Sequence, residues 1–546
     1  MSPGLVRAGA ALAALLWSTP GPLTGQQPSA AARLVAAADS NVLRAHLEFL
    51  ADDLLEGRAP ATRGGELAAK YIAAQFRRLG LEPAGDSGYF HRVPIITHTP
   101  SPALSVGGTA LRYRDHYVLW SMRDEEVVGA RGELVFVGYG IVAPEYRWND
   151  YAGVDVKGKI VVVLVNDPGL RDSTIFKGRI LTYYGRWTYK IEEAARQGAA
   201  GILLVHTTES ATYPWSTVTG SWTGEQVRLE RPATSLVVAG WITDSVAGEL
   251  FRRAGQDFAR VAGVAATREF RAVPLGLEAE ARVQSVLRRS ETFNVVARLP
   301  GRGPLAGEAV LVGGHYDHLG LGDPVDGDSI YNGAEDNASG TAAVLAAAEA
   351  FVRSGVMPRR SVLFMAFAAE ESGLLGAEAF AARPTVPLAK LAAVFNMDVM
   401  NLYGRTRDIS ALGADQSTLG ALFARAAAAE GLRVSESEDA LIKGSFFRSD
   451  HFPFVKAGVP ALSLEAGSDF VGRPADWGER QAEAYTAKRY HSPADEVLPW
   501  FSMGGAVQQL RVFLRTALAA ADAPRQPEWN RGSEFREAGE RRLMAQ

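Results

Sequence analysis

Apolar side chains recur at helical spacing in two stretches between residues 40 and 84, and Gly80 closes the second stretch. From about 127 to 275 the pattern changes to short apolar runs of the β type, separated by turn residues, with one helical stretch among them. From 292 to about 522, apolar strands alternate with alanine-rich helices. This alternation predicts an α/β fold in which helices cover both faces of a central β-sheet.

At 546 residues the chain is too long for one ordinary hydrophobic core, so more than one domain is expected. We expect residues 127–275 to form a smaller, β-rich α/β domain inserted into a main domain. The main domain would consist of an N-terminal part, 32–126, and a larger part, 276–524. The charged, proline-containing tail at 525–546 is expected to be held loosely.

The first residues resemble a secretory signal peptide. Arg7 precedes a run of ten apolar residues, and a segment rich in small residues and turn formers follows it. We place this signal at 1–26 and predict export to the periplasm or the extracellular space, with an uncleaved amphipathic anchor as the alternative. No later stretch reaches 18 apolar residues without a charge, so no stable membrane insertion is expected after cleavage.

Composition narrows the choice of partner and of metal ligand. The formal net charge of -4 gives no basic footprint, so we predict no nucleic-acid partner. The chain contains no cysteine, which excludes disulfides and thiolate metal sites. Any metal must therefore be held by His, Asp and Glu, a ligand set that suits zinc or another borderline divalent ion. The sequence carries no signal for an oligomeric state.

Acids and histidines follow or interrupt apolar runs at five places in the region after residue 300. An open α/β sheet builds its sites at the ends of its strands, so these side chains are expected to meet. Two histidines with several carboxylates match the needs of a two-metal hydrolytic centre, including a bridging carboxylate and a free base. The candidates are His315, Asp317, Asp336, Glu370, Glu371, Asp398 and His491.

Each candidate also has a purely structural interpretation. Asp336 is well placed to cap a helix that starts near Ser339, and adjacent acids such as Glu370 and Glu371 are common on exposed turns. Asp398 lies inside an almost continuous apolar run, where an unpaired carboxylate is costly, so its structural interpretation is weak. If the strand continues past His315, His318 faces away from the site. We favour a structural role for His318 and Asp323.

Five motifs in order give a family resemblance: "GGHYDHLG", "EDNASGTAAVLA", "FAAEESGLLGA", "NMDVMN" and "YHSPADE". They resemble the cocatalytic zinc aminopeptidases of family M28, and "LADDLLEGRAPATRGGELAAKYIAAQFRRLGLEPAG" resembles that family's N-terminal helices. Residues 127–275 resemble the protease-associated (PA) domain that is often inserted in such enzymes. The resemblance implies a zinc exopeptidase fold, that is, a mixed central β-sheet flanked by helices.

The resemblance also implies a role for each candidate. Two zinc ions would be bound, one by His315 and Asp398, the other by Glu371 and His491, with Asp336 bridging both. Glu370 would be the general base and Asp317 the partner that orients His315. The peptide bond after Asp336 would be cis. The expected function is an exported aminopeptidase that hydrolyses the N-termini of peptides or proteins.

Other functions on the same fold stay open at this point. A carboxypeptidase or dipeptidase would need arginines for a substrate carboxylate, and Arg448 is a candidate. A glutaminyl cyclase uses one zinc, and a receptor-like binding protein typically lacks ligands that are present here.

The segment 446–467 also resembles one that lines the substrate pocket in this family. Phe447, Ser449 and Asp450 are candidates for shaping it, although Asp450 and His451 equally fit a structural pair beneath the sheet. The aromatic segments 183–190 and 212–226 are placed in the smaller domain and are candidates for overhanging the site. For Trp187 we favour a role in the core of that domain.

Overall fold

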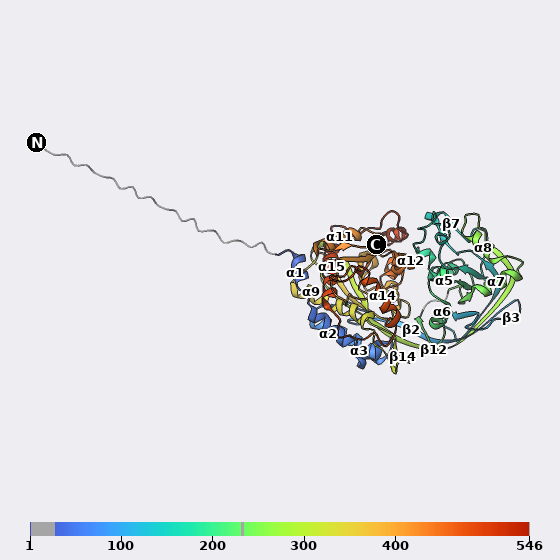
Figure 1. The fold of residues 1–546 in the computed structure, drawn as a ribbon, viewed down its shortest axis with the longest axis horizontal. Helices are drawn as coiled ribbons and strands as arrows, with labels where there is room; N and C mark the ends of the chain where they lie inside the picture. The colour runs from blue at the N-terminus through green and yellow to red at the C-terminus, as the bar shows by residue number, and fades with distance from the viewer. Residues whose placement is uncertain (2–27, 231–233, 545–546) are drawn as a thin grey trace.

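The computed structural model describes residues 1, 28–230 and 234–544. The predicted signal peptide, apart from its first residue, lies outside the described residues. Two lobes are visible, a larger one that contains α1, α9 and α15 and a smaller one that contains α5, α7 and α8 (Figure 1). None of the described helices combines the length and the apolar character needed to cross a membrane.

The larger lobe contains a mixed β-sheet whose central strands are parallel. In spatial order these are β20 (Ala461–Ala466), β17 (Leu391–Asn396), β13 (Ala309–His315) and β16 (Ser361–Phe367). On one side β18 (Asp408–Leu412) joins β20 in the antiparallel sense and carries the short β19 (Arg433–Val434). On the other side the end of β12 (Val273–Leu299) pairs with β16 in the antiparallel sense. The predicted mixed central sheet is therefore present.

Helices cover both faces of this sheet, as the unbroken apolar strands predict. Along β13, Val310 and Val312 pack in one hydrophobic cluster, whereas Ala309 and Leu311 pack in another on the opposite face. The first face is covered by α1 (Ala30–Ala36), α2 (Ser40–Leu50), α3 (Arg63–Arg78), α9 (Ser339–Ser354), α11 (Leu419–Ala429) and α15 (Met503–Asp522). The second is covered by α10 (Leu375–Ala382), α13 (Phe452–Lys456) and the C-terminal segment.

The prediction that the charged C-terminal tail is loosely held is wrong for its described part. Trp529 and Phe535 are buried in the second cluster, and α16 (Arg536–Met544) follows them. Within that helix, the Arg542 guanidinium donates to the carbonyl oxygens of Leu388 and Leu391 at 2.9 and 2.6 Å. Two aromatic anchors thus hold a segment whose average composition is polar.

The smaller lobe continues the same hydrogen-bonded sheet. Its strands run in the order β5 (Val127–Phe136), β8 (Ile160–Leu164), β9 (Gly201–His206) and β11 (Val238–Thr243), all parallel, with β4 (Tyr117–Ser121) antiparallel to β11. The strand β4 lies before residue 127, the predicted start of this unit. The helices of the lobe are α4 (Trp187–Arg196), α5 (Thr208–Ala211), α6 (Trp215–Trp222), α7 (Asp244–Arg253) and α8 (Phe258–Ala265).

Two long strands connect the lobes. β2 (Phe90–Val106) pairs with β12 without interruption from Phe90 opposite Val295 to Val106 opposite Ala279. One end of β12 pairs with β5 of the smaller lobe and the other with β16 of the larger lobe. Both strands are visible between the lobes in Figure 1.

Shorter elements complete the structure. Two small hairpins are formed by β14 (Gly320–Val325) with β15 (Asp328–Tyr331) and by β6 (Val142–Ala143) with β7 (Trp148–Asn149). Further strands and α-helices are β1 (Glu82–Pro83), β3 (Thr109–Ala110), β10 (Gln226–Leu229), α12 (Glu438–Lys443) and α14 (Trp477–Lys488).

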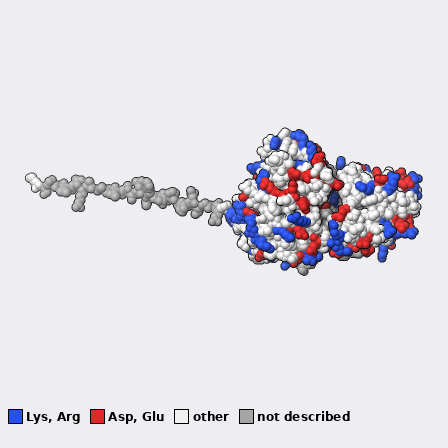
Figure 2. All heavy atoms as spheres, turned by 90° about the horizontal axis from the view of Figure 1, so that it is seen from below, with Lys and Arg blue, Asp and Glu red and all other residues white. Residues whose placement is uncertain are grey.

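Lys and Arg are interspersed with Asp and Glu over the face seen in Figure 2, and the outline of the molecule narrows between the lobes.

A fully buried arginine fastens the N-terminal helices to the sheet. The guanidinium of Arg58 donates to the carbonyl oxygens of Tyr316 at 2.7 Å, Asn332 at 2.5 Å and Gly333 at 3.0 Å, and also to that of Leu50. Tyr316 directly follows β13, whereas Gly333 precedes α9. One side chain therefore fixes the relative position of two loops that carry candidate site residues.

We expect Arg58→Met to lower the free energy of unfolding by about 3–5 kcal/mol, because several buried carbonyl groups lose their donor. Arg63→Met is the matched control, since Arg63 is exposed at the start of α3. Urea unfolding of both variants and of the wild type measures the difference. An Arg58→Met midpoint equal to that of the control would contradict the role given to Arg58.

Candidate metal centre

The predicted residues meet at the carboxyl edge of the parallel strands. His315 is the last residue of β13, while Glu370 and Glu371 lie shortly after β16 and Asp398 shortly after β17. Because these strands are parallel neighbours, their carboxyl ends share one edge of the sheet. The turn before α9 adds Asp336 to this edge.

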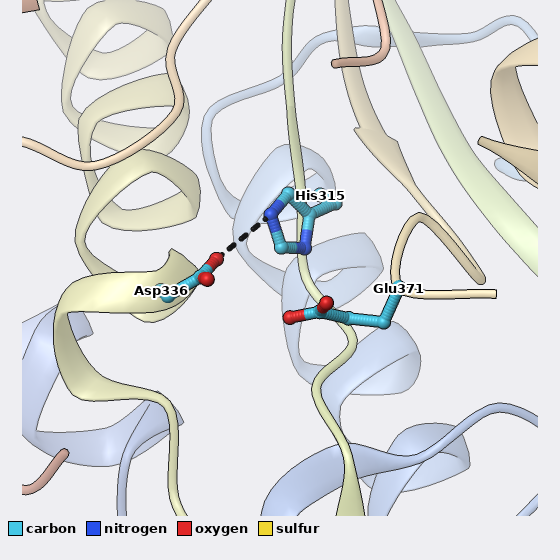
Figure 3. Close-up of side chains that lie close together, drawn as sticks. All are labelled: His315, Asp336 and Glu371. Carbon is cyan, nitrogen blue, oxygen red and sulfur yellow. Dashed lines mark ion pairs between the residues drawn. The ribbon is translucent and has the colours of Figure 1, made fainter. Parts of the chain in front are cut away.

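Asp336 lies between two histidines. Its Oδ1 is 3.2 Å from Nε2 of His315, and its Oδ2 is 3.5 Å from Nε2 of His491. Figure 3 shows the Asp336 carboxylate directed toward the His315 ring, with Glu371 on a separate loop nearby. The two oxygens of one carboxylate thus face two different imidazoles, which is the arrangement that a bridging ligand requires.

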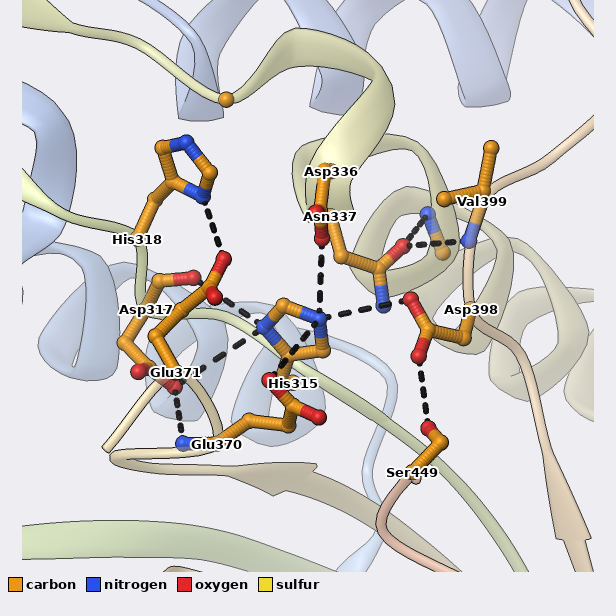
Figure 4. Close-up of polar contacts among 12 residues, drawn as sticks. His315, Asp317, His318, Asp336, Asn337, Glu370, Glu371, Asp398, Val399 and Ser449 are labelled. Carbon is orange, nitrogen blue, oxygen red and sulfur yellow. Dashed lines mark hydrogen bonds and ion pairs between the residues drawn. The ribbon is translucent and has the colours of Figure 1, made fainter. Parts of the chain in front are cut away.

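Each histidine has a further carboxylate beside it. Nε2 of His315 lies 3.3 Å from Oδ1 of Asp398, and Nε2 of His491 lies 3.0 Å from Oε2 of Glu371. The hydroxyl of Ser449 donates to Oδ2 of Asp398 at 2.6 Å and leaves Oδ1 toward the histidine (Figure 4). Ser449 therefore positions the carboxylate of Asp398, which differs from the pocket-lining role expected for it.

Glu370 lies farther from His315 than Asp336 and Asp398 do. Its Oε2 is 4.0 Å from Nε2 of His315. Burial raises the pKa of Glu370 well above its usual value, and the neighbouring Glu371 adds to that shift. A carboxyl group with a raised pKa is suited to accept and return a proton.

The carbonyl oxygen of Asp317 orients the His315 ring. Nδ1 of His315 donates to this backbone oxygen at 3.1 Å, while the carboxylate of Asp317 is 3.9 Å from Nδ1. The carboxylate instead accepts the backbone N–H of Glu370 at 3.1 Å. Since β13 ends at His315, the chain turns before Asp317, and the backbone oxygen of Asp317 rather than its carboxylate makes the hydrogen bond to the ring. The hydrogen bond at Nδ1 directs Nε2 toward Asp336 and Asp398.

The turn that carries Asp336 is held from two sides. Asp495 accepts the backbone N–H groups of Glu335 and Asp336 at 2.9 and 3.1 Å. Asn337 accepts the N–H of Val399 at 3.1 Å and so ties the turn to the loop of Asp398. The Asp336–Asn337 peptide bond is cis, as the family resemblance implies, and α9 begins at Ser339.

The pKa values of the cluster residues reflect the balance of buried charges around them. Burial opposes ionisation, yet hydrogen bonds with His318 and His491 lower the pKa of Glu371 to about 2. Burial likewise opposes the charged form of His491, but Asp336 and Glu371 raise its pKa to about 10. Burial raises the pKa of Asp317 to about 6. The cluster therefore favours cations strongly.

The expectation that His318 faces away is wrong. His318 is fully buried, and its Nδ1 lies 2.7 Å from Oε1 of Glu371 (Figure 4). The expectation assumed that the strand continues past His315 with alternating side chains, whereas β13 ends at His315. Asp323, in contrast, is exposed on β14.

The sequence interpretation also missed a buried ion pair behind the turn. Arg489 pairs with Glu335 at 2.9 Å, and the Tyr403 hydroxyl donates to the same carboxylate at 3.0 Å. Arg489 lies two residues before His491, so this pair positions the loop of that histidine. Nothing in the local sequence around Glu335 or Tyr403 indicates their contact.

Two residues expected near the pocket have other surroundings. Phe447 packs against Phe452 and Tyr183 at ring distances of 5.3 and 6.2 Å and belongs to the core. Asp450 and His451 are both buried, and neither side chain has a hydrogen-bond partner among the described residues. The structural pair considered for them is therefore not formed.

The donor set fits zinc. One imidazole nitrogen with the carboxylate oxygens of Asp336 and Glu371, and the same imidazole with Glu370 and Asp398, form two groups whose atoms lie within 4.8 Å of one another. The Nε2 atoms of His315 and His491 each face two carboxylate oxygens at 3.0 to 3.5 Å. Nitrogen and oxygen donors at such spacing are those of zinc sites.

Comparison with known proteins adds a family to this geometry. Residues 294–503 match the model of peptidase family M28. This M28-matching segment contains the whole cluster from His315 to His491. Its limits exclude the N-terminal helices and most of the smaller lobe.

Individual relatives match parts of the chain. The chain is 31% identical over 209 residues to leupeptin-inactivating enzyme 1 of Streptomyces exfoliatus, which covers 38% of this chain and 43% of the relative. It is 32% identical over 123 residues to leucine aminopeptidase 1 of Trichophyton equinum, covering 22% and 32%. The chain thus spans less than half the length of either relative. The solved aminopeptidase from Aneurinibacillus sp. strain AM-1 aligns with a TM-score of 0.45 and 19% identity over 91% of this chain and 97% of that one.

We expect Asp495→Asn to weaken zinc binding by about 10- to 100-fold, because one of the two backbone groups that position Asp336 loses its carboxylate acceptor. The exposed neighbour supplies the control, Glu496→Gln. Competition with a chromogenic chelator measures the affinity of each protein for zinc. Equal affinities for the two variants would show that the Asp336 turn holds its position without Asp495.

Proposed function

We propose that this chain is an exported zinc aminopeptidase that removes residues from the N-termini of peptides or proteins. The observation that carries the proposal is the cluster of buried histidines and carboxylates at one sheet edge, inside the segment that matches family M28. The residues 127–275 are proposed to serve as its protease-associated domain, inserted between parts 32–126 and 276–524 of the catalytic domain. Residues 1–26 are proposed to direct export.

The ligand assignment that we propose contains two zinc ions. His315 and Asp398 hold one ion, His491 and Glu371 hold the other, and Asp336 serves both. The distances from Asp336 to the two imidazoles support this division, as does the pairing of each imidazole with its own second carboxylate. Asp317 and Ser449 orient ligands and are not ligands themselves.

Bound zinc ions supply Lewis-acid chemistry: they polarise the peptide carbonyl group and bring the pKa of water toward neutrality. The side chain of Glu370 accepts the proton of the attacking water and delivers it to the amine of the leaving peptide. Its burial keeps the proton close to the reacting atoms. The surrounding carboxylates favour a cationic group, and the protonated N-terminus of a peptide is such a group.

The names of the relatives support the substrate class. One matched relative is a leucine aminopeptidase and another inactivates leupeptin. Peptides with a free N-terminus are accordingly the proposed substrates of this chain.

The activity is tested with a panel of aminoacyl-anilides. It is also tested with pairs of peptides that share one sequence, one with a free and one with an acetylated N-terminus. We expect hydrolysis only where the N-terminus is free, loss of activity on chelation, and recovery on addition of zinc. Chelation is also expected to lower the thermal midpoint, because the clustered carboxylates then repel one another. Hydrolysis of acetylated peptides at the same rate would overturn the aminopeptidase assignment.

The two adjacent glutamates are expected to fail differently when each is changed to glutamine. Glu371→Gln should lose zinc as well as activity, since it removes a proposed ligand. Glu370→Gln should keep both ions and similar KM but lose about 10²- to 10⁴-fold in kcat, the contribution typical of a general base. Metal analysis beside steady-state kinetics measures both effects. Zinc loss in Glu370→Gln with retention in Glu371→Gln would reverse the two roles.

A further inference from the structure

The hydrophobic cores of the two lobes meet at Tyr183. This residue lies four positions before α4 of the smaller lobe, and its ring contacts Tyr189 of that helix at a centroid distance of 5.2 Å. The same ring contacts three phenylalanines of the larger lobe, Phe452 at 5.1 Å, Phe535 at 5.9 Å and Phe447 at 6.2 Å. These three rings also contact one another. They form an aromatic socket that receives Tyr183.

Polar contacts hold Tyr183 in this socket. Its backbone N–H donates to Oε2 of Glu534 at 2.9 Å, and Oε1 of Glu534 pairs with Lys177 of the smaller lobe at 3.3 Å. The Glu534 side chain is only 2% exposed, so its charge depends on these partners. The Tyr183 hydroxyl donates to Glu192 of α4, and that carboxylate also pairs with Lys456 of α13 at 3.0 Å. Charged groups from both lobes thus fasten the contact.

The socket adjoins the segment that carries Ser449. Phe447 and Phe452 flank Ser449 in sequence, and the backbone N–H of Phe452 donates to the carbonyl oxygen of Ser449 at 2.9 Å. The Ser449 hydroxyl accepts from the side chain of Asn396 at 2.7 Å and donates to Asp398 at 2.6 Å (Figure 4). A shift of the two phenylalanines therefore moves the hydroxyl that orients Asp398.

Close packing makes this connection mechanical. The interior of a protein leaves few voids, and a side chain that loses its neighbour relaxes toward the gap. Three rings of the socket contact Tyr183, and two of them lie within three residues of Ser449. The position of Ser449 consequently depends on a ring that belongs to the other lobe.

We propose that docking of the smaller lobe through Tyr183 fixes Ser449 and, through Ser449, the zinc ligand Asp398. This inference rests on the proposed function, which assigns Asp398 to the same ion as His315. Tyr183 is a positioning residue, since it acts on the metal centre through Ser449. The smaller lobe is then a part of the metal centre's support, and the larger lobe alone holds one of its ligands loosely.

Zinc binding to chelator-treated protein, followed by calorimetry, tests the proposal without relying on catalysis. We expect Tyr183→Ala to weaken one of the two zinc ions by about 10- to 100-fold and to leave the other within about twofold, because only one ion is held by Asp398. Tyr183→Phe keeps the ring and should bind both ions as the wild type does. This rescue by the conservative variant is not expected if the hydroxyl carries the effect.

Phe258→Ala is the matched control, since Phe258 packs on Phe251 at 5.0 Å within the smaller lobe. It should lower the thermal midpoint and leave zinc binding unchanged. Equal losses of zinc affinity in Phe258→Ala and Tyr183→Ala would overturn the proposal, because they would reflect a general loss of stability. Glu534→Gln loosens the docking while keeping every ring, and it should weaken the same ion as Tyr183→Ala. Unchanged zinc binding in both Tyr183→Ala and Glu534→Gln would also overturn the proposal.

A double-mutant cycle tests the route through Ser449. Ser449→Ala is expected to weaken the same ion, and Tyr183→Ala combined with Ser449→Ala should bind zinc no more weakly than Ser449→Ala alone. Losses that multiply in the double variant would show that Tyr183 does not act through Ser449. A crystal structure of zinc-free Tyr183→Ala gives an answer that needs no metal. We expect the Ser449 hydroxyl to lie beyond hydrogen-bond distance of Asp398, and an unchanged contact would overturn the proposal.

These outcomes are distinct from those that test the proposed function. A wild-type protein that binds two zinc ions but hydrolyses no peptide would refute the aminopeptidase activity, and the zinc titrations would still decide the role of Tyr183. A wild-type protein that binds no zinc would overturn both the proposed metal centre and the role given to Tyr183.

Discussion

Mutual repulsion among buried carboxylates at the carboxyl edge of the sheet is the constraint on which the structure depends. These groups come from six separate segments, and in a poorly solvated place each raises the cost of ionising the next. The histidines, the ion pair of Arg489 and the charge of Arg58 offset this repulsion. Arg58 interacts electrostatically with Asp317, Asp495, Asp336 and Glu371. The donor spacing leaves room for metal cations to complete the balance. The acids in question are Asp317, Glu335, Asp336, Glu370, Glu371, Asp398, Asp450 and Asp495.

Much of the larger lobe is predictable from local pattern because its strands are buried on both faces and its helices are rich in alanine. The candidate residues were found for the same reason: an acid or a histidine directly after an apolar run stands out against it. Asp336, Glu371 and Asp398 are each adjacent in sequence to the strand or helix that positions them. Chemistry placed at strand ends is therefore visible before any contact is known.

The supporting residues were not predictable in this way. Arg58, Asp495 and Tyr403 contact the site from distant parts of the chain, and their neighbours in sequence give no sign of it. The direction of His318 depends on where β13 ends, which the apolar pattern does not specify to the residue. The packing of the C-terminal segment depends on Trp529 and Phe535, which an average over its many charges conceals. Composition and periodicity are averages over many residues. They therefore reveal neither long-range contacts nor the effect of a single buried side chain.

The continuous β2–β12 ladder sets how the molecule can deform. Two lobes joined by flexible loops rotate freely relative to each other, whereas here any relative rotation must bend or twist a pair of hydrogen-bonded strands within the one sheet that runs through both lobes. Bending this pair of strands costs energy, so the lobes return to one relative orientation instead of rotating freely. The ladder therefore sets the spacing of the two lobes before any ligand binds, so little conformational entropy is left to lose when a ligand does bind.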